Sequence, residues 1–177
     1  LSDLELRAVK TLNPEEVSLL LTNEKIPANP EALKNLFAVK KRFELCFEGK
    51  THLQFLKEIA DLLKLDTSLT LNTEQRKTCL ESVKNFFEIK SLKPPVPNNY
   101  VDLLEALADL DLYDSRVFER LEAKLCAGIK AKHYSGTLTI EMTESLARLR
   151  IKPAKLLESI SENIVRDFPQ INLGFYV

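Results

Sequence analysis

A helical pattern of apolar residues recurs about 39 residues apart in the C-terminal half of this chain, a spacing typical of helical-repeat proteins. Residues 103–110 read Leu-Leu-Glu-Ala-Leu-Ala-Asp-Leu, and residues 142–149 read Met-Thr-Glu-Ser-Leu-Ala-Arg-Leu. The match continues into a following helix, where the paired positions are Leu112 and Ile151, Val117 and Leu156, Phe118 and Leu157, Leu121 and Ile160, and Leu125 and Ile164. Two helices per unit, repeated at a fixed spacing, are typical of an α-solenoid, which buries its core between neighbouring units and exposes an extended surface. The pattern therefore favours binding over catalysis.

Capping signals divide the chain into helices. Asn followed by Pro and acidic residues, as at Asn13 and Asn29, fits an N-cap with Pro at the first helical position. The other expected starts lie at Thr73, Asn99, Asp114 and Thr139. The predicted helices cover 14–23, 30–47, 51–65, 73–90, 99–110, 114–131, 138–149 and 153–167, and a turn near 2–10 would be a ninth. Their pairing predicts an all-α fold, a right-handed α-solenoid of about four helix-turn-helix repeats.

Prolines set the predicted domain organisation. Residues 91–98 read Ser-Leu-Lys-Pro-Pro-Val-Pro-Asn, and three prolines remove backbone donors and fix φ, so we expect no helix there. Residues 1–90 would then form N-terminal helical repeats, 91–98 a stiff connector that acts as a hinge or a docking loop, and 99–167 C-terminal repeats. A length of 177 residues suits one continuous domain.

The last ten residues, 168–177, form an apolar tail. They include Phe, Ile, Leu, Phe, Tyr and Val, whereas a chain terminus is normally polar. Two interpretations remain open: the tail folds back over the last repeat, or it docks into another protein through residues such as Phe175 and Tyr176.

Charge is unevenly distributed although the net charge is only −1. Residues 102–122 carry a net charge of −5 and residues 123–155 a net charge of +5. These are either solvated helix faces or adjacent patches that orient a partner. The candidate partner-binding residues of the basic segment are Lys124, Lys130, Lys132, Arg148, Arg150, Lys152 and Lys155. The absence of an overall basic charge weighs against nucleic-acid binding.

Residue patterns typical of catalysis or metal binding are missing. Cys46, Cys79 and Cys126 are widely spaced among apolar residues, so we expect buried free thiols and a reducing compartment. His52 and His133 are isolated from other metal-ligand types. The four glycines are not clustered in a phosphate-binding loop, and no run of 18 apolar residues predicts a membrane span. We therefore expect no enzyme activity, no cofactor, no metal and no small-molecule substrate.

Residues 99–167 resemble a family of helical repeats. The segment Leu103–Leu110, followed by Leu112–Leu121, looks like the heptatricopeptide-type repeats of FAST-kinase-like and RAP-domain proteins, and more loosely like octotricopeptide and pentatricopeptide arrays. The unit that starts at Met142 is similar, whereas residues 14–90 match poorly. The resemblance implies a mitochondrial setting and a role in RNA metabolism or in the assembly of large complexes.

These observations predict a non-catalytic interaction or scaffold subunit of a mitochondrial multiprotein assembly, such as a ribosome, an RNA-processing complex, or a respiratory or ATP-synthase complex. The alternative is an RNA-binding helical-repeat protein of organellar RNA metabolism. Basic side chains gathered on one face would favour RNA, and basic side chains paired with the acids of 102–122 would favour a scaffold.

Overall fold

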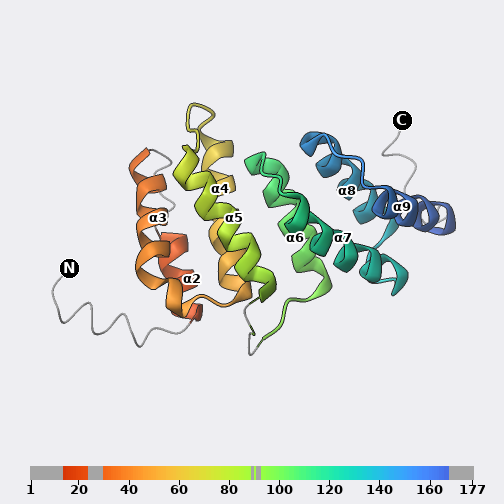
Figure 1. The fold of residues 1–177 in the computed structure, drawn as a ribbon, viewed down its shortest axis with the longest axis horizontal. Coiled ribbons are helices and arrows are strands. Elements are labelled where there is room, and N and C mark those ends of the chain that lie inside the picture. Colours follow the sequence, from red (N-terminus) through yellow and green to blue (C-terminus); the bar gives the residue numbers. More distant parts are fainter. Residues whose placement is uncertain (1–13, 24–29, 89, 91–92, 168–177) are drawn as a thin grey trace. The chain divides into compact units, whose positions relative to one another are not determined.

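The computed structural model describes residues 14–23, 30–88, 90 and 93–167 of the chain (Figure 1). Every regular element in these ranges is helical, which confirms the predicted all-α class. The elements are α2 (Pro14–Asn23), α3 (Pro30–Phe43), the short 3-10 helix η1 (Glu44–Cys46), α4 (Gly49–Leu65), α5 (Thr73–Glu88), α6 (Pro97–Leu110), α7 (Ser115–Lys130), α8 (Gly136–Leu149) and α9 (Ala154–Asp167). The turn predicted near 2–10 and the tail 168–177 lie outside the described residues.

Helix α6 begins earlier than predicted, inside the supposed connector. Pro97 occupies the first helical turn, where a missing N–H costs nothing because that donor has no helical partner. The Asn99 side chain reaches back, and its Oδ1 accepts a hydrogen bond from the Val96 N–H at 2.8 Å. The prediction that residues 91–98 exclude helix is therefore wrong at Pro97 and Asn98.

Two other predicted N-caps are also wrong, and one is confirmed. Helix α8 is capped by Ser135, whose hydroxyl accepts from the Leu138 N–H at 3.2 Å, while Thr139 lies buried inside the helix. Helix α5 is preceded by Asn72, which exchanges two hydrogen bonds with Gln75 in the reciprocal pattern of a capping box. Asp114 caps α7 as predicted, and its carboxylate accepts from the Val117 N–H at 3.1 Å.

The helices fall into two compact units, one within residues 1–95 and one within 96–177, named unit 1 and unit 2 below. In unit 1, α4 packs against α2, α3 and α5, and α2 packs against α3 (Figure 1). The core of this unit draws buried side chains from all four helices, and on the central α4 Phe55, Leu56, Ile59 and Leu62 are fully buried.

Unit 2 consists of two helix pairs, α6/α7 and α8/α9, whose helices begin at equivalent positions of the repeat. Helices α6 and α8 each span 14 residues and start at 97 and 136, and α7 and α9 start at 115 and 154. The sequence spacing from α6 to α8 is therefore the same as the spacing from α7 to α9. Helix α6 packs on α8, α7 packs on α9, and the two helices of each pair also pack on each other.

The two pairs of unit 2 also share their turns and their buried positions. Helix α6 is followed by the C-cap residue Asp111 and α8 by the C-cap residue Arg150, both in the left-handed conformation with φ of 50° and 57°. The N–H of each C-cap residue donates to two carbonyls at equivalent positions, those of Leu107 and Ala108 in α6 and those of Leu146 and Ala147 in α8. These bonds give partners to carbonyl groups of the last helical turn. Leu107 and Leu146 are 3% and 2% exposed, so the prediction that they occupy equivalent buried positions is confirmed. Within the described ranges, no helix has the length and apolar character needed to cross a membrane.

Candidate interaction surfaces

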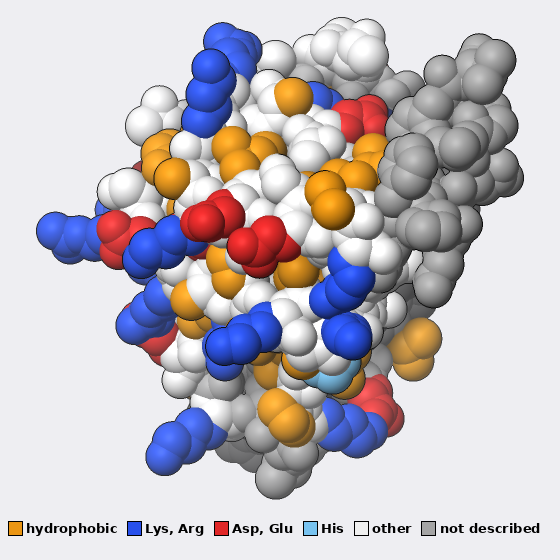
Figure 2. Space-filling view, turned by 90° about the vertical axis from the view of Figure 1, so that its right-hand side faces the viewer, with side chains coloured by type: hydrophobic (Ala, Val, Ile, Leu, Met, Phe, Trp, Pro, Cys, Tyr) orange, Lys and Arg blue, Asp and Glu red, His pale blue; other side chains and the backbone are white. Residues whose placement is uncertain are grey.

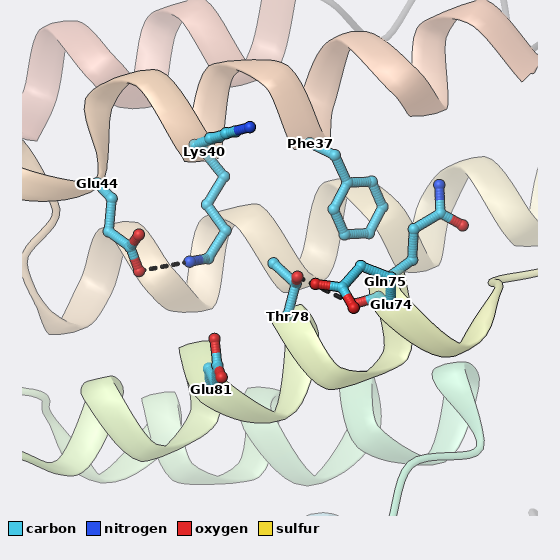
Figure 3. A pocket seen from close by; sticks show the side chains of 8 residues that line it. Phe37, Lys40, Glu44, Glu74, Gln75, Thr78 and Glu81 are labelled. Carbon is cyan, nitrogen blue, oxygen red and sulfur yellow. Dashed lines mark hydrogen bonds and ion pairs between the residues drawn. The ribbon is translucent and has the colours of Figure 1, made fainter.

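A groove of about 370 Å³ lies between α3 and α5 in unit 1 (Figure 3). It is called the α3–α5 groove below. Its lining residues are Phe37, Lys40, Lys41, Glu44, Glu74, Gln75, Thr78 and Glu81. Polar side chains enter it from both sides: Lys40 and Glu44 lie on one wall, and Thr78 and Glu81 lie on the other. The surface is thus polar and of mixed charge.

Lys40 is the unusual residue of this groove because it is charged and only 2% exposed. Its Nζ donates to Oε1 of Glu44 at 2.7 Å and lies 5.9 Å from the centre of the Phe55 ring. A buried ammonium group is tolerated only when such partners replace water. Lys40 therefore belongs to the packed interior as much as to the groove.

His52 on α4 is fully buried in the same unit. Neither of its ring nitrogens has a hydrogen-bond partner among the described residues, and its ring meets Phe47 at a centroid distance of 5.0 Å. Burial, followed by the positive charge of Lys40, lowers the pKa of His52 from 6.5 to about 3. The imidazole is consequently neutral at every pH near neutrality.

A second groove, of about 460 Å³, lies between α7 and α9 in unit 2. This α7–α9 groove is lined by Glu119, Glu122, Ala123, Cys126, Lys155, Glu158 and Ser159. Burial is the main cause that raises the pKa of the Cys126 thiol, and the charge of Glu122 adds to it. The raised pKa keeps the sulfur in the weakly reactive thiol form.

The two grooves share a position and a chemistry. Each lies between the second helices of successive pairs, α3 and α5 in unit 1 and α7 and α9 in unit 2. Each is lined by three glutamates together with lysine and hydroxyl side chains. Carboxylates repel nucleic-acid phosphates and attract basic side chains. Such walls therefore suit a protein segment better than a nucleic-acid backbone.

The structure distributes the predicted basic residues over several elements of unit 2. Lys124 and Lys130 lie on α7, Arg148 on α8 and Lys155 on α9; the remaining residues of the set, Lys132, Arg150 and Lys152, lie in turns. All seven are exposed, and only Lys155 lines the α7–α9 groove. Figure 2 views the side of the structure that carries α8 and α9, and its basic side chains are interspersed with acidic and apolar side chains.

Two members of the basic set make contacts between helices. Arg148 forms an ion pair with Asp109, which occupies the equivalent position of the preceding repeat, so this pair links α6 to α8. The Lys124 ammonium lies 5.9 Å from the centre of the Tyr100 ring and links α7 to α6. In the second pair, Asn163 holds the position of Lys124 and Thr139 holds that of Tyr100. There Nδ2 of Asn163 donates a hydrogen bond to Oγ1 of Thr139 at 3.2 Å and links α9 to α8. These contacts give Arg148 and Lys124 structural roles.

A third surface is formed by the outer side of α8 and α9. Five positions that are buried in α6, α7 and the loop between them are half-buried or exposed in α8, α9 and their connecting loop. The buried members are Leu104, Ala108, Leu112, Phe118 and Leu125, and their equivalents are Thr143, Ala147, Ile151, Leu157 and Ile164. Helices α8 and α9 pack on α6 and α7, so these are the positions that a following layer would cover. The five residues of the second pair are called the end face below.

Sequence reasoning missed the two grooves and the buried lysine. Leu33, Leu36, Lys40 and Phe43 follow one another on a single helical face, and Glu44 stands four residues after Lys40. This pattern could have predicted that Lys40 lies on the buried face of the helix and forms an ion pair with Glu44. The grooves left no such signal because they arise from packing between distant segments. Phe175 and Tyr176, the predicted contacts of the tail, lie outside the residues that the structure describes.

Neither the chemistry of these surfaces nor comparison with known proteins assigns an activity. In the part of the chain that is described, no three His, Cys, Asp or Glu side chains gather as a metal site would require. Comparison with protein-family models, with curated proteins and with solved structures gave no match.

Proposed function

We propose that the protein is a non-catalytic interaction subunit, a right-handed α-solenoid of about four helix-turn-helix repeats that binds other proteins through its lateral grooves. The observation that carries the proposal is the recurrence of an open groove of mixed charge between second helices, once in each unit. The equal displacement of helix starts and turns between the two pairs of unit 2 supports the solenoid arrangement.

The mitochondrial setting of the proposal rests on the resemblance of residues 99–167 to heptatricopeptide-type repeats. In that setting the protein would serve as a scaffold subunit of a ribosome, an RNA-processing complex, or a respiratory or ATP-synthase complex. Fractionation of cells that express the tagged protein tests this part separately, and recovery in the cytosol alone would contradict it.

The alternative, an RNA-binding repeat protein, is favoured by the exposure of the basic side chains in the turns and on α7 and α9. Two observations weigh against it. Arg148 is used in an ion pair with Asp109, and the groove beside Lys155 is lined by three glutamates. Binding of RNA phosphates would need a patch of Lys and Arg side chains without carboxylates beside them.

Charge-neutralising variants separate the two functions. Three glutamates of the α7–α9 groove are replaced in the groove variant Glu119→Gln, Glu122→Gln and Glu158→Gln. Exposed glutamates of α8 and α9 are replaced in the matched control Glu141→Gln, Glu144→Gln and Glu162→Gln. In affinity purification with nuclease, we expect the groove variant to lose the proteins that the native chain and the control retain. Equal recovery with all three chains would contradict groove binding.

The RNA alternative is tested by filter binding to a single-stranded RNA at several salt concentrations. The relevant variant is Lys130→Ala, Lys132→Ala and Lys152→Ala. An affinity that falls steeply with salt, and falls again in this variant, would support RNA binding over the scaffold role. We expect weak binding that the variant does not change.

A further inference from the structure

We propose that the α3–α5 groove binds a basic peptide segment in the polyproline II conformation. A backbone carbonyl of the segment would accept a hydrogen bond from Lys40, and two basic side chains would pair with Glu74 and Glu81. Because it specifies what one lateral groove takes up, this assignment rests on the proposed function. At about 370 Å³ the groove has the size of a ligand pocket.

The most deeply buried residue that lines the groove carries hydrogen-bond donors that are only partly used. Lys40 is 2% exposed, and its ammonium group has three N–H donors. Among the described residues, its only hydrogen-bond acceptor is Oε1 of Glu44, at 2.7 Å (Figure 3). A ligand that reaches Lys40 must bring an acceptor atom, because an ammonium group accepts no hydrogen bond.

The charges of the walls favour a basic ligand. Lys40 is already paired with Glu44. This pairing leaves Glu74 and Glu81 on α5 and Lys41 on α3, a net charge of −1. Glu74 and Glu81 are exposed, and neither carboxylate forms an ion pair within the described part of the chain. Lysine or arginine side chains of a partner would therefore find unpaired carboxylates on the α5 wall.

The spacing of these two carboxylates fits one backbone conformation of the segment. Glu74 and Glu81 are seven residues apart on one helix, which places them about 10.5 Å apart along its axis. In a polyproline II helix, residues three apart lie on the same side at a separation of about 9.3 Å. Two basic residues with two residues between them can therefore meet both carboxylates.

A helical segment would fit the buried donor less well. The backbone carbonyls inside an α-helix are occupied by its own hydrogen bonds, so such a segment has none to offer to Lys40. The carbonyls of polyproline II are free, because this conformation has no internal hydrogen bonds. Phe37 is half-buried and lines the same groove, so it adds an aromatic surface of the kind that polyproline II segments contact.

The test is a titration of the full chain with two short peptides, followed by the NMR shifts of its backbone amides. The probe is the capped peptide Ala-Lys-Pro-Pro-Lys-Pro-Ala. The matched peptide Ala-Lys-Lys-Pro-Pro-Pro-Ala has the same composition, but its lysines are adjacent. We expect the probe to bind roughly fivefold more tightly, because only its lysines reach both carboxylates. The largest shifts should lie in α3 and α5.

Variants connect the binding to the named contacts. Lys40→Met removes the buried donor and should weaken binding of the probe roughly tenfold. Glu74→Gln with Glu81→Gln should weaken it roughly fivefold and remove the preference for the probe over the matched peptide. The control, Glu31→Gln with Glu88→Gln, changes exposed glutamates that do not line the groove and should leave binding unchanged.

Equal binding of the two peptides, or largest shifts outside α3 and α5, would overturn the proposal. Full affinity in a Lys40→Met chain that keeps its native melting temperature would also overturn it. If Lys40→Met does not fold, the double glutamine variant decides the outcome. The proposed function is judged separately, by the proteins recovered in affinity purification. If these are recovered while neither peptide binds, the interaction role stands and the polyproline II segment is rejected.

Discussion

Unit 1 and unit 2 are both built from paired helices beside a lateral groove, yet they bury different chemistry. Unit 1 buries Lys40, His52 and Glu58. The buried polar groups described in unit 2 are the neutral Thr139, Ser145 and Asn163, the Tyr134 phenol, whose pKa burial raises to about 12, and the Asp109 side chain, which is 5% exposed and paired with Arg148. A buried ionisable group ties stability to pH, and a neutral one does not. Near neutral pH the difference rests on His52, whose pKa is lowered to about 3, so we expect pH sensitivity in the first unit and packing sensitivity in the second.

The two units also differ in how their buried polar groups are satisfied. In unit 2, Asn163 donates to Thr139, and the Thr139 hydroxyl donates to the Gly136 carbonyl at 2.7 Å. In unit 1, both nitrogens of His52 lack a partner within the described part of the chain. A buried polar group without a hydrogen bond costs roughly 1–3 kcal/mol, so unit 1 carries a penalty that unit 2 avoids at these positions.

The largest expected effect tests the packing of unit 2. Leu107→Ala and Leu146→Ala should each lower the free energy of unfolding by about 2–5 kcal/mol, because each removes a buried leucine from an equivalent place. Urea unfolding followed by far-UV circular dichroism measures both. A large cost at one position and none at the other would break the equivalence of the two helix pairs.

The next effect concerns the turn that joins these pairs. Tyr134 is 3% exposed, and its hydroxyl donates to the Pro97 carbonyl at 2.8 Å. A Cβ at Gly128 would lie 2.7 Å from Cζ and Oη of that ring. Gly128→Ala should therefore destabilise the protein by about 1–3 kcal/mol through overpacking.

Thermal unfolding in a Tyr134→Ala background is the control for this steric explanation. Without the ring, Gly128→Ala should be neutral or stabilising, since alanine is the better helix former by about 1 kcal/mol. A cost that persists without the ring would show that the contact with Tyr134 is not its cause.

The third effect tests the pH sensitivity of unit 1. The folded-state pKa of His52 is about 3 and its ordinary value is 6.5, so above pH 6.5 both states are neutral and His52 adds no pH dependence. Below pH 6.5 only the unfolded state takes up the proton, and stability falls by about 1.4 kcal/mol per pH unit. We expect the native chain to lose about 2 kcal/mol between pH 6.5 and 5 through this group.

The variant His52→Leu should remove most of this loss, while the matched change at the exposed His133, His133→Leu, should leave it intact. Urea unfolding at pH 7, 6 and 5 measures the slope. An unchanged slope in His52→Leu would assign the pH dependence to other groups and would remove the proposed difference between the units.

The contrast between the units also shows what the sequence could predict. Helix positions were predictable because caps and apolar spacing are local, and Asp114 is an example. The start of α6 at Pro97 was missed because the prolines of residues 91–98 were treated only as helix breakers, although proline was predicted at the start of two other helices. The turns at Asp111 and Arg150 carry no glycine, so their left-handed conformation left no sequence signal.

The candidate surfaces were less predictable than the helices. The basic residues were found as a charge run, but their exposure and the pairing of Arg148 with Asp109 depend on how α8 packs on α6. The grooves and the end face depend on packing between segments far apart in sequence. Local spacing therefore predicts the helices, and the tertiary arrangement decides which side chains remain available to a partner.

The smallest expected effect is that of removing the buried charge of unit 1. Lys40→Met should change the free energy of unfolding by less than about 1 kcal/mol, because the lost ion pair and ring contact are offset by the relief of burying an ammonium group. Glu44→Ala should instead destabilise the protein, since it leaves that ammonium group without its carboxylate. Lys40→Met should leave the pH dependence between pH 7 and pH 5 nearly unchanged, because burial is the larger cause of the low pKa of His52 and keeps it far below 5 without the charge of Lys40. Urea unfolding of both variants at pH 7 and pH 5 measures these effects. If Lys40→Met cost as much as Leu107→Ala, the buried charge would be a main support of unit 1, and the contrast with unit 2 would have to be redrawn.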